Sequence, residues 1–412
     1  MLFSILDYGA INDGVTLNTT AIQTAIDECA QSGGGSVLIP EGIFVTGTLI
    51  LKQGVDLHIS SNGVLLGSSD YNSYPERNDV KHVDSAKLPR YRNACLIFAE
   101  ECENISITGM GKIDCNGHNF VKLKDKYDGG WKYERIDAPT PPRAVFFTGC
   151  KNIRIEDVTM VNQPSGWSYW IHDCDFVNFD KVKIFADTEY PNNDGIHINS
   201  SRNVTISNCS IVTGDDCIIV RANNVSLPEN KVCEKVTVTN CNLTSYACGI
   251  RIGWLNDGTI RNCTFSNIVM TDTNVGIGIN LPGHALDDKW ADEGREATLI
   301  ENLSFDNIVM DEIYCAPIKC YIGDSPVVKC NAIRNIYFSN IHARGLDFPF
   351  FSGRRDNTVK NITLNNCSFE KVSEDQMKDY RGHGAYWGKP INNLIFTHAE
   401  NVLISNTTFT AK

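Results

Sequence analysis

The stretch Arg202-Asn203-Val204-Thr205-Ile206-Ser207-Asn208-Cys209 decides the fold, because it is one copy of a phrase that recurs along the chain. The phrase consists of a polar pair, three to five alternating β-forming residues, and an Asn near its end. Period-2 alternation rich in Val, Ile and Thr indicates β-strands rather than helices. Further copies occupy 234–241, 103–107 and 151–155, or start near residues 260, 300, 333, 359 and 401.

Most intervals between these copies are about 25–50 residues, which corresponds to one or two coils of short strands joined by turns. The spacing predicts an all-β chain that forms a parallel β-helix, a solenoid, as a single domain over residues 1–412. A β-sandwich is the competing fold, but its strands would not repeat one phrase. The recurring Asn residues are predicted to form a side-chain amide ladder, although each also suits an ordinary turn.

The N-terminal end of the chain and three internal stretches do not follow the repeated pattern. Residues 18–30 are predicted to form a capped amphipathic helix that covers the first coil and ends at Gly33-Gly34-Gly35. Three stretches, about 118–142, 281–299 and 370–392, lack the phrase and are predicted to be loops that line or cover a site. Within the last, residues 381–390 are glycine-rich and aromatic, which suits either a lid or a plain surface loop.

Composition excludes several classes of function. The net charge of −12 argues against nucleic acid or an anionic membrane as partner, and it disfavours a polyanionic substrate unless basic residues line the site. None of the 16 cysteines forms a C-x-x-C pair, so we expect neither a metal site nor a redox site, and no cofactor. Four cysteines follow Asn, at 209, 241, 263 and 367, and are predicted to stack as buried residues from coil to coil.

The first residues bear on localisation. The segment Met1-Leu2-Phe3-Ser4-Ile5-Leu6 has no basic region and no long apolar run, so it does not resemble a secretion signal. Together with the many free thiols this favours a cytoplasmic protein. A secreted protein is the alternative, if a leader has been removed upstream.

Two acidic segments, Asn192-Asn193-Asp194-Gly195 and Gly214-Asp215-Asp216-Cys217, place three carboxylates about one repeat apart. The 21 residues from Asp194 to Asp215 bring both segments to one face of a coiled β repeat. Like charges disfavour ionisation, so one acid retains its proton and can protonate a leaving oxygen, while the others activate water. From the residues alone, turn-capping acids and calcium ligands remain alternatives.

In a coiled β chain, this pair of motifs resembles glycoside hydrolase family 28, the polygalacturonase family. The opening of the chain is similar to the wider pectin-degrading β-helix superfamily, in the segments 7–10, 12–14, 21–23, 33–35 and 37–42. The resemblance extends over about residues 5–410 and implies a right-handed β-helix. It also implies that Asp215 is the general acid and that Asp194 and Asp216 hold the water. The implied outcome is inversion without metal or covalent intermediate, with Asn192 at the substrate.

The sequence departs from the family pattern in two places. Cys248 stands where the family has a His, and Gly278 and Asn280 stand where it has an Arg and a Lys that hold the carboxylate of galacturonate. Losing them removes two charge-assisted hydrogen bonds, each worth about 1.5–3 kcal/mol. Galacturonate at that subsite is therefore in question, and a neutral or deoxy sugar such as rhamnose is the alternative. Arg251 faces outward beside Cys248 and is either a relocated guanidinium for a carboxylate or a solvated side chain.

Further side chains near the acids are candidates for sugar contact. In the strand that follows Asp194, alternation turns His197 outward, and His197 and Asn280 are predicted substrate contacts. Cys248 has no base beside it in sequence, so we do not expect a nucleophile there. Trp167 and Trp170 suit either stacking on sugar rings or core packing.

Together these features predict an inverting, exo-acting hydrolase of pectin-type oligosaccharides. Two other classes remain open. A polysaccharide lyase would need calcium and a basic residue that abstracts a proton beside a carboxylate. A non-catalytic glycan-binding β-helix would explain the replaced family residues. The oligomeric state is left open.

Overall fold

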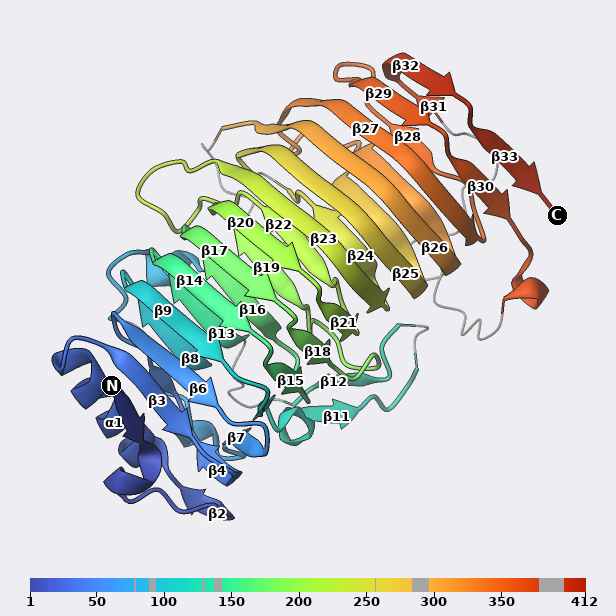
Figure 1. Cartoon of the computed structure of the whole chain (residues 1–412). Coiled ribbons are helices and arrows are strands. Elements are labelled where there is room, and N and C mark those ends of the chain that lie inside the picture. The colour runs from blue at the N-terminus through green and yellow to red at the C-terminus, as the bar shows by residue number, and fades with distance from the viewer. Residues whose placement is uncertain are drawn as a thin grey trace.

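The computed structural model describes residues 1–77, 79–88, 94–127, 130–136, 143–255, 257–283, 296–377 and 396–412. The chain winds as a parallel β-helix, with successive coils stacked from the N-terminal to the C-terminal end (Figure 1). All pairings within the 31-stranded sheet that forms the coils are parallel, and each strand pairs with its counterparts in the neighbouring coils. The predicted fold class is confirmed.

Three rows of strands form the sides of the solenoid. The site row contains β5 (Leu49–Ile50), β8 (Cys95–Glu100), β13 (Arg143–Thr148), β16 (Trp167–His172), β19 (Ile196–Asn199), β22 (Ile218–Arg221), β24 (Cys248–Ile252), β28 (Phe350–Ser352) and β31 (Phe396–Thr397). The second row contains β1 (Leu2–Ser4), β3 (Gly35–Ile39), β6 (Val55–Ile59), β9 (Glu103–Thr108), β14 (Lys151–Glu156), β17 (Asp175–Asp180), β20 (Arg202–Ser207), β29 (Val359–Asn365) and β32 (Ala399–Ser405). The third contains β2 (Asp13–Leu17), β4 (Gly42–Thr46), β7 (Gly63–Gly67), β10 (Lys112–Asp114), β15 (Thr159–Val161), β18 (Lys183–Phe185), β21 (Ser210–Thr213), β30 (Ser368–Lys371) and β33 (Thr408–Ala411).

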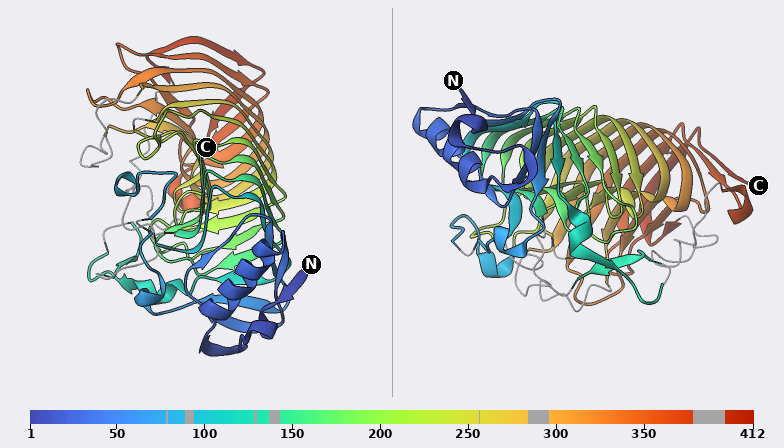
Figure 2. Two further views of the ribbon diagram at one scale, coloured as in Figure 1. Left: turned by 90° about the vertical axis from the view of Figure 1, so that its left-hand side faces the viewer. Right: turned by 90° about the horizontal axis from the view of Figure 1, so that it is seen from below.

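The remaining elements turn corners or lie outside the coils. Four long strands run through more than one row: β23 (Cys233–Ser245), β25 (Thr259–Leu281), β26 (Thr298–Ile322) and β27 (Cys330–Gly345). Outside the rows lie the antiparallel hairpin β11 (Val121–Leu123) and β12 (Tyr133–Arg135), and the short 3-10 turns η1 (Ile5–Tyr8), η2 (Tyr71–Ser73), η3 (Ser85–Lys87), η4 (Gly117–Phe120) and η6 (Glu374–Gln376). In both views of Figure 2 the hairpin stands off the stacked coils.

Helix α1 (Thr19–Gln31) covers the first coil, as predicted. Its apolar face, with Ile22, Ile26 and Cys29, is completely buried. The side chain of Asn18 does not cap the helix; it bonds the backbone of Ile11, accepting from its N–H at 2.7 Å and donating to its carbonyl. The cap predicted at the start of this helix is therefore not formed by the side chain of Asn18, because its amide satisfies the preceding turn instead.

Recurrent Asn residues hold the corners of the coils. Asn302, Asn335, Asn361 and Asn401 all adopt the left-handed backbone conformation, with φ near +55°, which Asn tolerates better than most residues. Each side-chain amide donates to the Asn of the preceding coil at 2.7–3.1 Å, a ladder that begins at Asn262. The predicted amide ladder is confirmed, and it coexists with the turn role.

The interior is one continuous apolar cluster that runs from η1 to β30. Aromatic rings stack along it, as where Phe305 lies between Phe265 and Phe338 with centroids 4.8 and 5.0 Å away. The Asn-Cys cysteines are buried but do not form one column. Cys209 lies beside Cys241, whereas the next coil places Ile268 beside Cys241. The predicted cysteine stack is limited to that pair, because apolar residues of several kinds fill the position.

Ion pairs between neighbouring coils line the outer edge of the second row. Paired carboxylates and cations meet across neighbouring coils in Glu103–Lys151, Asp175–Arg202, Glu234–Arg261, Glu301–Arg334 and Glu400–Lys360. A strand shifted by one residue would lose these contacts, so the row supports the register that the buried face requires.

The three stretches that lack the repeated phrase differ in the structure. Residues 118–142 contain the hairpin β11–β12 rather than a plain loop. Most of 281–299 and of 370–392, including the candidate lid at 381–390, lies outside the described residues. Among the described residues, no helix is long and apolar enough to cross a membrane. The cytoplasmic location stays a prediction.

Candidate active site

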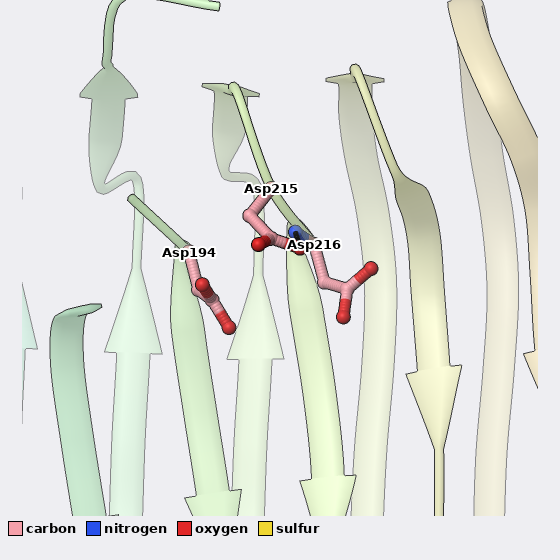
Figure 3. A group of neighbouring side chains, drawn as sticks. All are labelled: Asp194, Asp215 and Asp216. Atoms are coloured by element: carbon pink, nitrogen blue, oxygen red, sulfur yellow. Dashed lines mark hydrogen bonds between the residues drawn. The ribbon is translucent and has the colours of Figure 1, made fainter. Parts of the chain in front are cut away.

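The three acids meet at the starting edge of the site row (Figure 3). Ile196 of β19 pairs with Ile218 of β22, so Asp194 and Asp216, two residues earlier in each coil, lie side by side. Asp215 adjoins them, and one oxygen of each carboxylate lies within 4.8 Å of one oxygen of both others. All three side chains are buried, with 5–7% exposed. The predicted convergence of the acids is confirmed by this geometry.

The bend at Gly214 is fixed from both sides of the chain. A Cβ at Gly214 would lie 2.3 Å from the Tyr190 carbonyl oxygen, so only glycine fits. The side chain of Asn193 accepts hydrogen bonds from the backbone N–H of Gly214 at 2.7 Å and of Asp215 at 3.2 Å. Its amide nitrogen donates to the Asp187 carbonyl at 2.7 Å. Asn193 thus connects the turn that carries Asp194 to the turn that carries Asp215.

The carboxylates of Asp215 and Asp216 are themselves oriented by donors. Asn192 donates from its side-chain amide to Asp215 at 3.0 Å and so orients that acid, while its contact with substrate stays a prediction. The backbone N–H of Asp216 donates to the other oxygen of Asp215 at 3.0 Å. The backbone N–H of Cys248 donates to Asp216 at 2.9 Å. Polar donors therefore set the direction of both carboxylates before any substrate arrives.

Arg251 supplies the positive charge beside the acids. Its Nε lies 3.0 Å from Oδ2 of Asp216, and only 2% of the residue is exposed. Burial by itself lowers the pKa of this guanidinium, but the adjacent Asp216 carboxylate outweighs it and the net pKa is raised. Arg251 is thus an outward-facing but buried cation, and the prediction of a solvated side chain is wrong.

Arg251 pairs with Gly278 in the next coil, and Gly278 pairs with Lys319 in the coil after that. A Cβ at Gly278 would meet Asn280 Oδ1 at 3.0 Å and Cys248 Sγ at 3.1 Å, so the site cannot take a larger side chain there without movement. Burial raises the pKa of the Cys248 thiol well above its ordinary value, which keeps it protonated and unreactive, as expected. Asn280 is 6% exposed, and its Oδ1 accepts no hydrogen bond from the described residues.

On the N-terminal side of the acids the face becomes aromatic. His197 lies beside Asp194, with Nδ1 4.0 Å from Oδ2, and its ring contacts Trp167 at 4.0 Å between centroids. Burial lowers the pKa of His197 well below its ordinary value, so the ring is neutral. Trp170 is 1% exposed and stacks on Phe146 at 4.4 Å, so core packing holds for it and sugar stacking does not.

A segment that crosses the site row covers this aromatic end; we call residues 79–88 the strap. Its side chains Val80, Val83 and Leu88 pack on Phe98, Phe146 and Trp170. Its polar contacts lie beyond the ends of the strands, at Glu101 after β8, Asp173 after β16 and Ser226 after β22.

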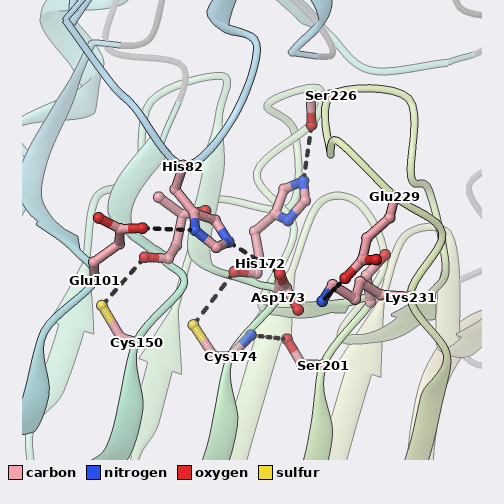
Figure 4. A network of polar contacts seen from close by, with 12 residues as sticks. His82, Glu101, Cys150, His172, Asp173, Cys174, Ser201, Ser226, Glu229 and Lys231 are labelled. Carbon is pink, nitrogen blue, oxygen red and sulfur yellow. Dashed lines mark hydrogen bonds and ion pairs between the residues drawn. The ribbon is translucent and has the colours of Figure 1, made fainter.

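The strap's fastening is polar (Figure 4). His82 contacts Asp173 at 2.9 Å and Glu101 at 3.3 Å, and the hydrogen bond with Asp173 raises the pKa of the imidazole. The backbone N–H of Asp84 donates to the Ser226 carbonyl at 2.8 Å. The hydroxyl of Ser226 in turn contacts His172 Nε2 at 3.0 Å. These contacts hold the strap at the ends of the strands, the edge of the site row opposite to the acids.

Sequence reasoning missed Asn193, Lys319, the strap and the hairpin residue Trp131. Asn193 sits inside the quoted acidic motif, so its amide could have been considered. Lys319 could have been found by counting the repeat one coil beyond Gly278. Trp131 and the strap leave no local signal, because their partners are about 80–90 residues away.

Comparison with known proteins agrees with this geometry. The sequence profile of glycosyl hydrolases family 28 matches residues 29–346, which include all three acids. The chain belongs to glycosyl hydrolases family 28. The predicted resemblance is confirmed, and with it a fold seen in enzymes that hydrolyse glycosidic bonds.

Family 28 relatives include polygalacturonases. A "Probable polygalacturonase" of Vitis vinifera is 28% identical over 289 residues, 67% of this chain and 56% of that protein. An "Exopolygalacturonase clone GBGE184" of Arabidopsis thaliana is 26% identical over 349 residues, 82% of this chain and 72% of that protein. The structure of a family 28 exopolygalacturonase from Yersinia enterocolitica superposes with a TM-score of 0.69 at 18% identity, over all of this chain and 78% of that one. The shared fold is a right-handed parallel β-helix, as the resemblance implied.

Proposed function

We propose that this family 28 protein is an exo-acting glycoside hydrolase of pectin-type oligosaccharides. The observation that carries the proposal is the position of the acid cluster, directly beside the end of the site row that the strap covers. On the face that the described residues form, a sugar chain reaches the acids from the C-terminal side, since extending past them would require the strap to leave Phe146 and Trp170.

The proposed mechanism requires one acid that carries a proton and others that activate a water molecule. Three carboxylates this close retain a proton, because complete ionisation would place uncompensated like charges together. Arg251 forms an ion pair with Asp216, and the family resemblance gives the role of general acid to Asp215. Asp215 protonates the glycosidic oxygen as the C–O bond breaks, and Asp194 with Asp216 removes a proton from the attacking water.

Inversion is the part of this mechanism that rests on family membership. Inverting glycosidases usually separate their two carboxyl groups by about 6.5–9.5 Å and retaining ones by about 5–5.5 Å. One oxygen of each carboxylate in this cluster lies within 4.8 Å of one oxygen of the others, which is a shorter measure than the separation between carboxyl groups and does not decide between the two outcomes. Arg251 and the Cys248 N–H occupy both oxygens of Asp216, which weakens that carboxylate as a nucleophile and supports water as the attacking group.

Cationic side chains support a substrate with carboxylates. Arg251 and Lys319 occupy the same row position on either side of Gly278, about 9–10 Å apart at two strand spacings. A galacturonate carboxylate over Gly278 would lie between Arg251 and Lys319. These two cations would then take the place of the missing family Arg and Lys. The second candidate is removal of a neutral or deoxy sugar, which the ion pair between Arg251 and Asp216 favours because it already engages the guanidinium.

The test is sugar release from a panel of homogalacturonan, rhamnogalacturonan and neutral-sugar-capped oligosaccharides, with and without a chelator. We expect one monosaccharide, unaffected by chelation, from wild type and not from Asp215→Asn. Lys319→Met should raise KM on galacturonate oligosaccharides and leave a neutral-capped substrate unchanged. A product that absorbs in the ultraviolet and needs calcium would establish a lyase instead, and binding without turnover would establish a glycan-binding protein.

A further inference from the structure

Three consecutive turns at the starting edge of the site row carry the chemistry. The turn at 187–194 ends at Asp194, the turn at 213–216 contains Asp215 and Asp216, and the turn at 245–248 ends at Cys248. Backbone hydrogen bonds between coils reach into these turns: the Gly195 N–H donates to the Asp216 carbonyl at 2.9 Å, and the Tyr246 N–H donates to the Thr213 carbonyl at 3.1 Å. The peptide between Gly214 and Asp215 bonds side chains instead. The orientation of the peptide that leads into Asp215 therefore depends on side-chain contacts as well as on the sheet.

The hairpin β11–β12 makes such a contact with each of these turns. The indole Nε1–H of Trp131 donates to the Gly214 carbonyl at 2.5 Å. The hydroxyl of Tyr246 donates to the Gly130 carbonyl at 3.0 Å. The backbone N–H of Tyr133 donates to the Glu189 carbonyl at 3.2 Å. One segment, far earlier in sequence, thus touches the turn of Asp194, the turn of Asp215 and the turn of Cys248.

Ring packing and burial hold the hairpin β11–β12 rigidly against the three turns. Trp131 is 8% exposed, and its ring centroid lies 6.4 Å from that of Tyr246. Tyr133 packs edge-on against Tyr190 at 4.9 Å, and Lys132 forms an ion pair with Glu189 at 2.9 Å. Contacts of this kind restrict the hairpin in position and angle, so a displacement of one turn is resisted by the other two.

We propose that Trp131 is a positioning residue for the general acid. The peptide that joins Gly214 to Asp215 is held at its N–H by Asn193, which accepts from Asp215 at 3.2 Å, and at its carbonyl by Trp131, so its plane has one orientation. That plane sets the direction in which Asp215 leaves the backbone, and with it the distance from Asp215 to Asp194. A shift of about 1 Å in such a group costs on the order of 100-fold in rate. The inference rests on the proposed role of Asp215.

The test compares two hairpin variants. Trp131→Phe keeps an aromatic ring against Tyr246 and removes only the indole N–H. We expect kcat to fall about 10- to 100-fold with KM changed less than about twofold, because the acid is misplaced after the substrate has bound. Arg135→Gln is the matched control: Arg135 bonds Ser165 at 2.7 Å, on a turn that carries none of the three acids, and kcat should stay within about twofold.

A second readout separates this inference from the proposed function. Backbone amide exchange at residues 214–216 should accelerate in Trp131→Phe and not in Arg135→Gln, whatever the substrate is. Equal effects of the two variants on kcat and on exchange would overturn the positioning role. A raised KM with unchanged kcat would also overturn it, since Trp131 would then bind substrate. Absence of turnover in wild type, with the exchange difference present, would count against the proposed function alone.

Discussion

Removing the charge of Arg251 is expected to destabilise the fold as well as the site. In Arg251→Met the side chain keeps a similar length, but Asp216 remains buried among two other carboxylates without its cation. Breaking one side of a buried ion pair typically costs about 3–5 kcal/mol, because the remaining charge has lost its compensation.

The expected shift in melting temperature follows from chain length. Unfolding entropy of about 2.1 cal/mol/K per residue gives about 0.9 kcal/mol/K for the 412 residues. A loss of about 3–5 kcal/mol therefore corresponds to a Tm lower by about 3–6 °C. The double variant Arg251→Met/Asp216→Asn removes both charges and should recover most of that loss, since replacing a whole buried pair is often nearly neutral.

Calorimetry of four proteins tests this expectation: wild type, the single variant, the double variant and a surface control. Arg261→Met is the control, because Arg261 pairs with Glu234 at 2.7 Å but is 40% exposed, and such pairs contribute at most about 1 kcal/mol. A Tm of Arg251→Met equal to that of Arg261→Met would refute the reasoning. So would a double variant no more stable than the single one.

Three further outcomes are expected. Phe305→Ala removes a ring stacked between two others and should cost about 3–5 kcal/mol, measured as a Tm lower by about 3–6 °C; an unchanged Tm would mean that the stack is not tightly packed. Burial lowers the pKa of His172 from 6.5 to about 3, so between these pH values its imidazole binds a proton in the unfolded chain but not in the folded chain. As pH is lowered from 6.5 to about 3, the free energy of unfolding should therefore decrease by about 1.4 kcal/mol per pH unit. The variant His172→Asn should show a smaller decrease in urea titrations at the same pH values. The pKa of His82 is raised, so its contribution is complete below pH 6.5 and is lost as pH rises through the folded-state value. His82→Gln should make the strap more sensitive to protease at pH 5.5 and release internal cleavage products; identical digestion of both proteins would contradict this.

The sequence was sufficient for the coil and for the meeting of the acids. Both depend on local periodicity, since alternation fixes which side chains face inward and the 21-residue interval returns Asp215 beside Asp194. The outward direction of His197 and Arg251 followed from the same rule. Their burial did not, because Trp167 and neighbouring segments cover a face that alternation alone leaves open.

Contacts that close over the site row could not be predicted. His82 reaches Asp173 across 91 residues, and Trp131 reaches Gly214 across 83, with no shared period to relate them. Asn18 shows the same limit on a small scale, because a residue typical of a helix cap bonds an earlier turn when that turn offers better-placed partners. Periodicity predicts the scaffold, whereas the segments outside it are specified by individual long-range contacts.

The stereochemistry of the first product tests the central claim most directly. Proton NMR during hydrolysis of a galacturonate trisaccharide would record which anomer appears before mutarotation, with Asp215→Asn as the blank. We expect a single monosaccharide of inverted configuration, formed by wild type only, as water activated by Asp194 and Asp216 requires. A product of retained configuration would contradict this, and would instead mean that one of the carboxylates attacks the anomeric carbon and forms a covalent intermediate.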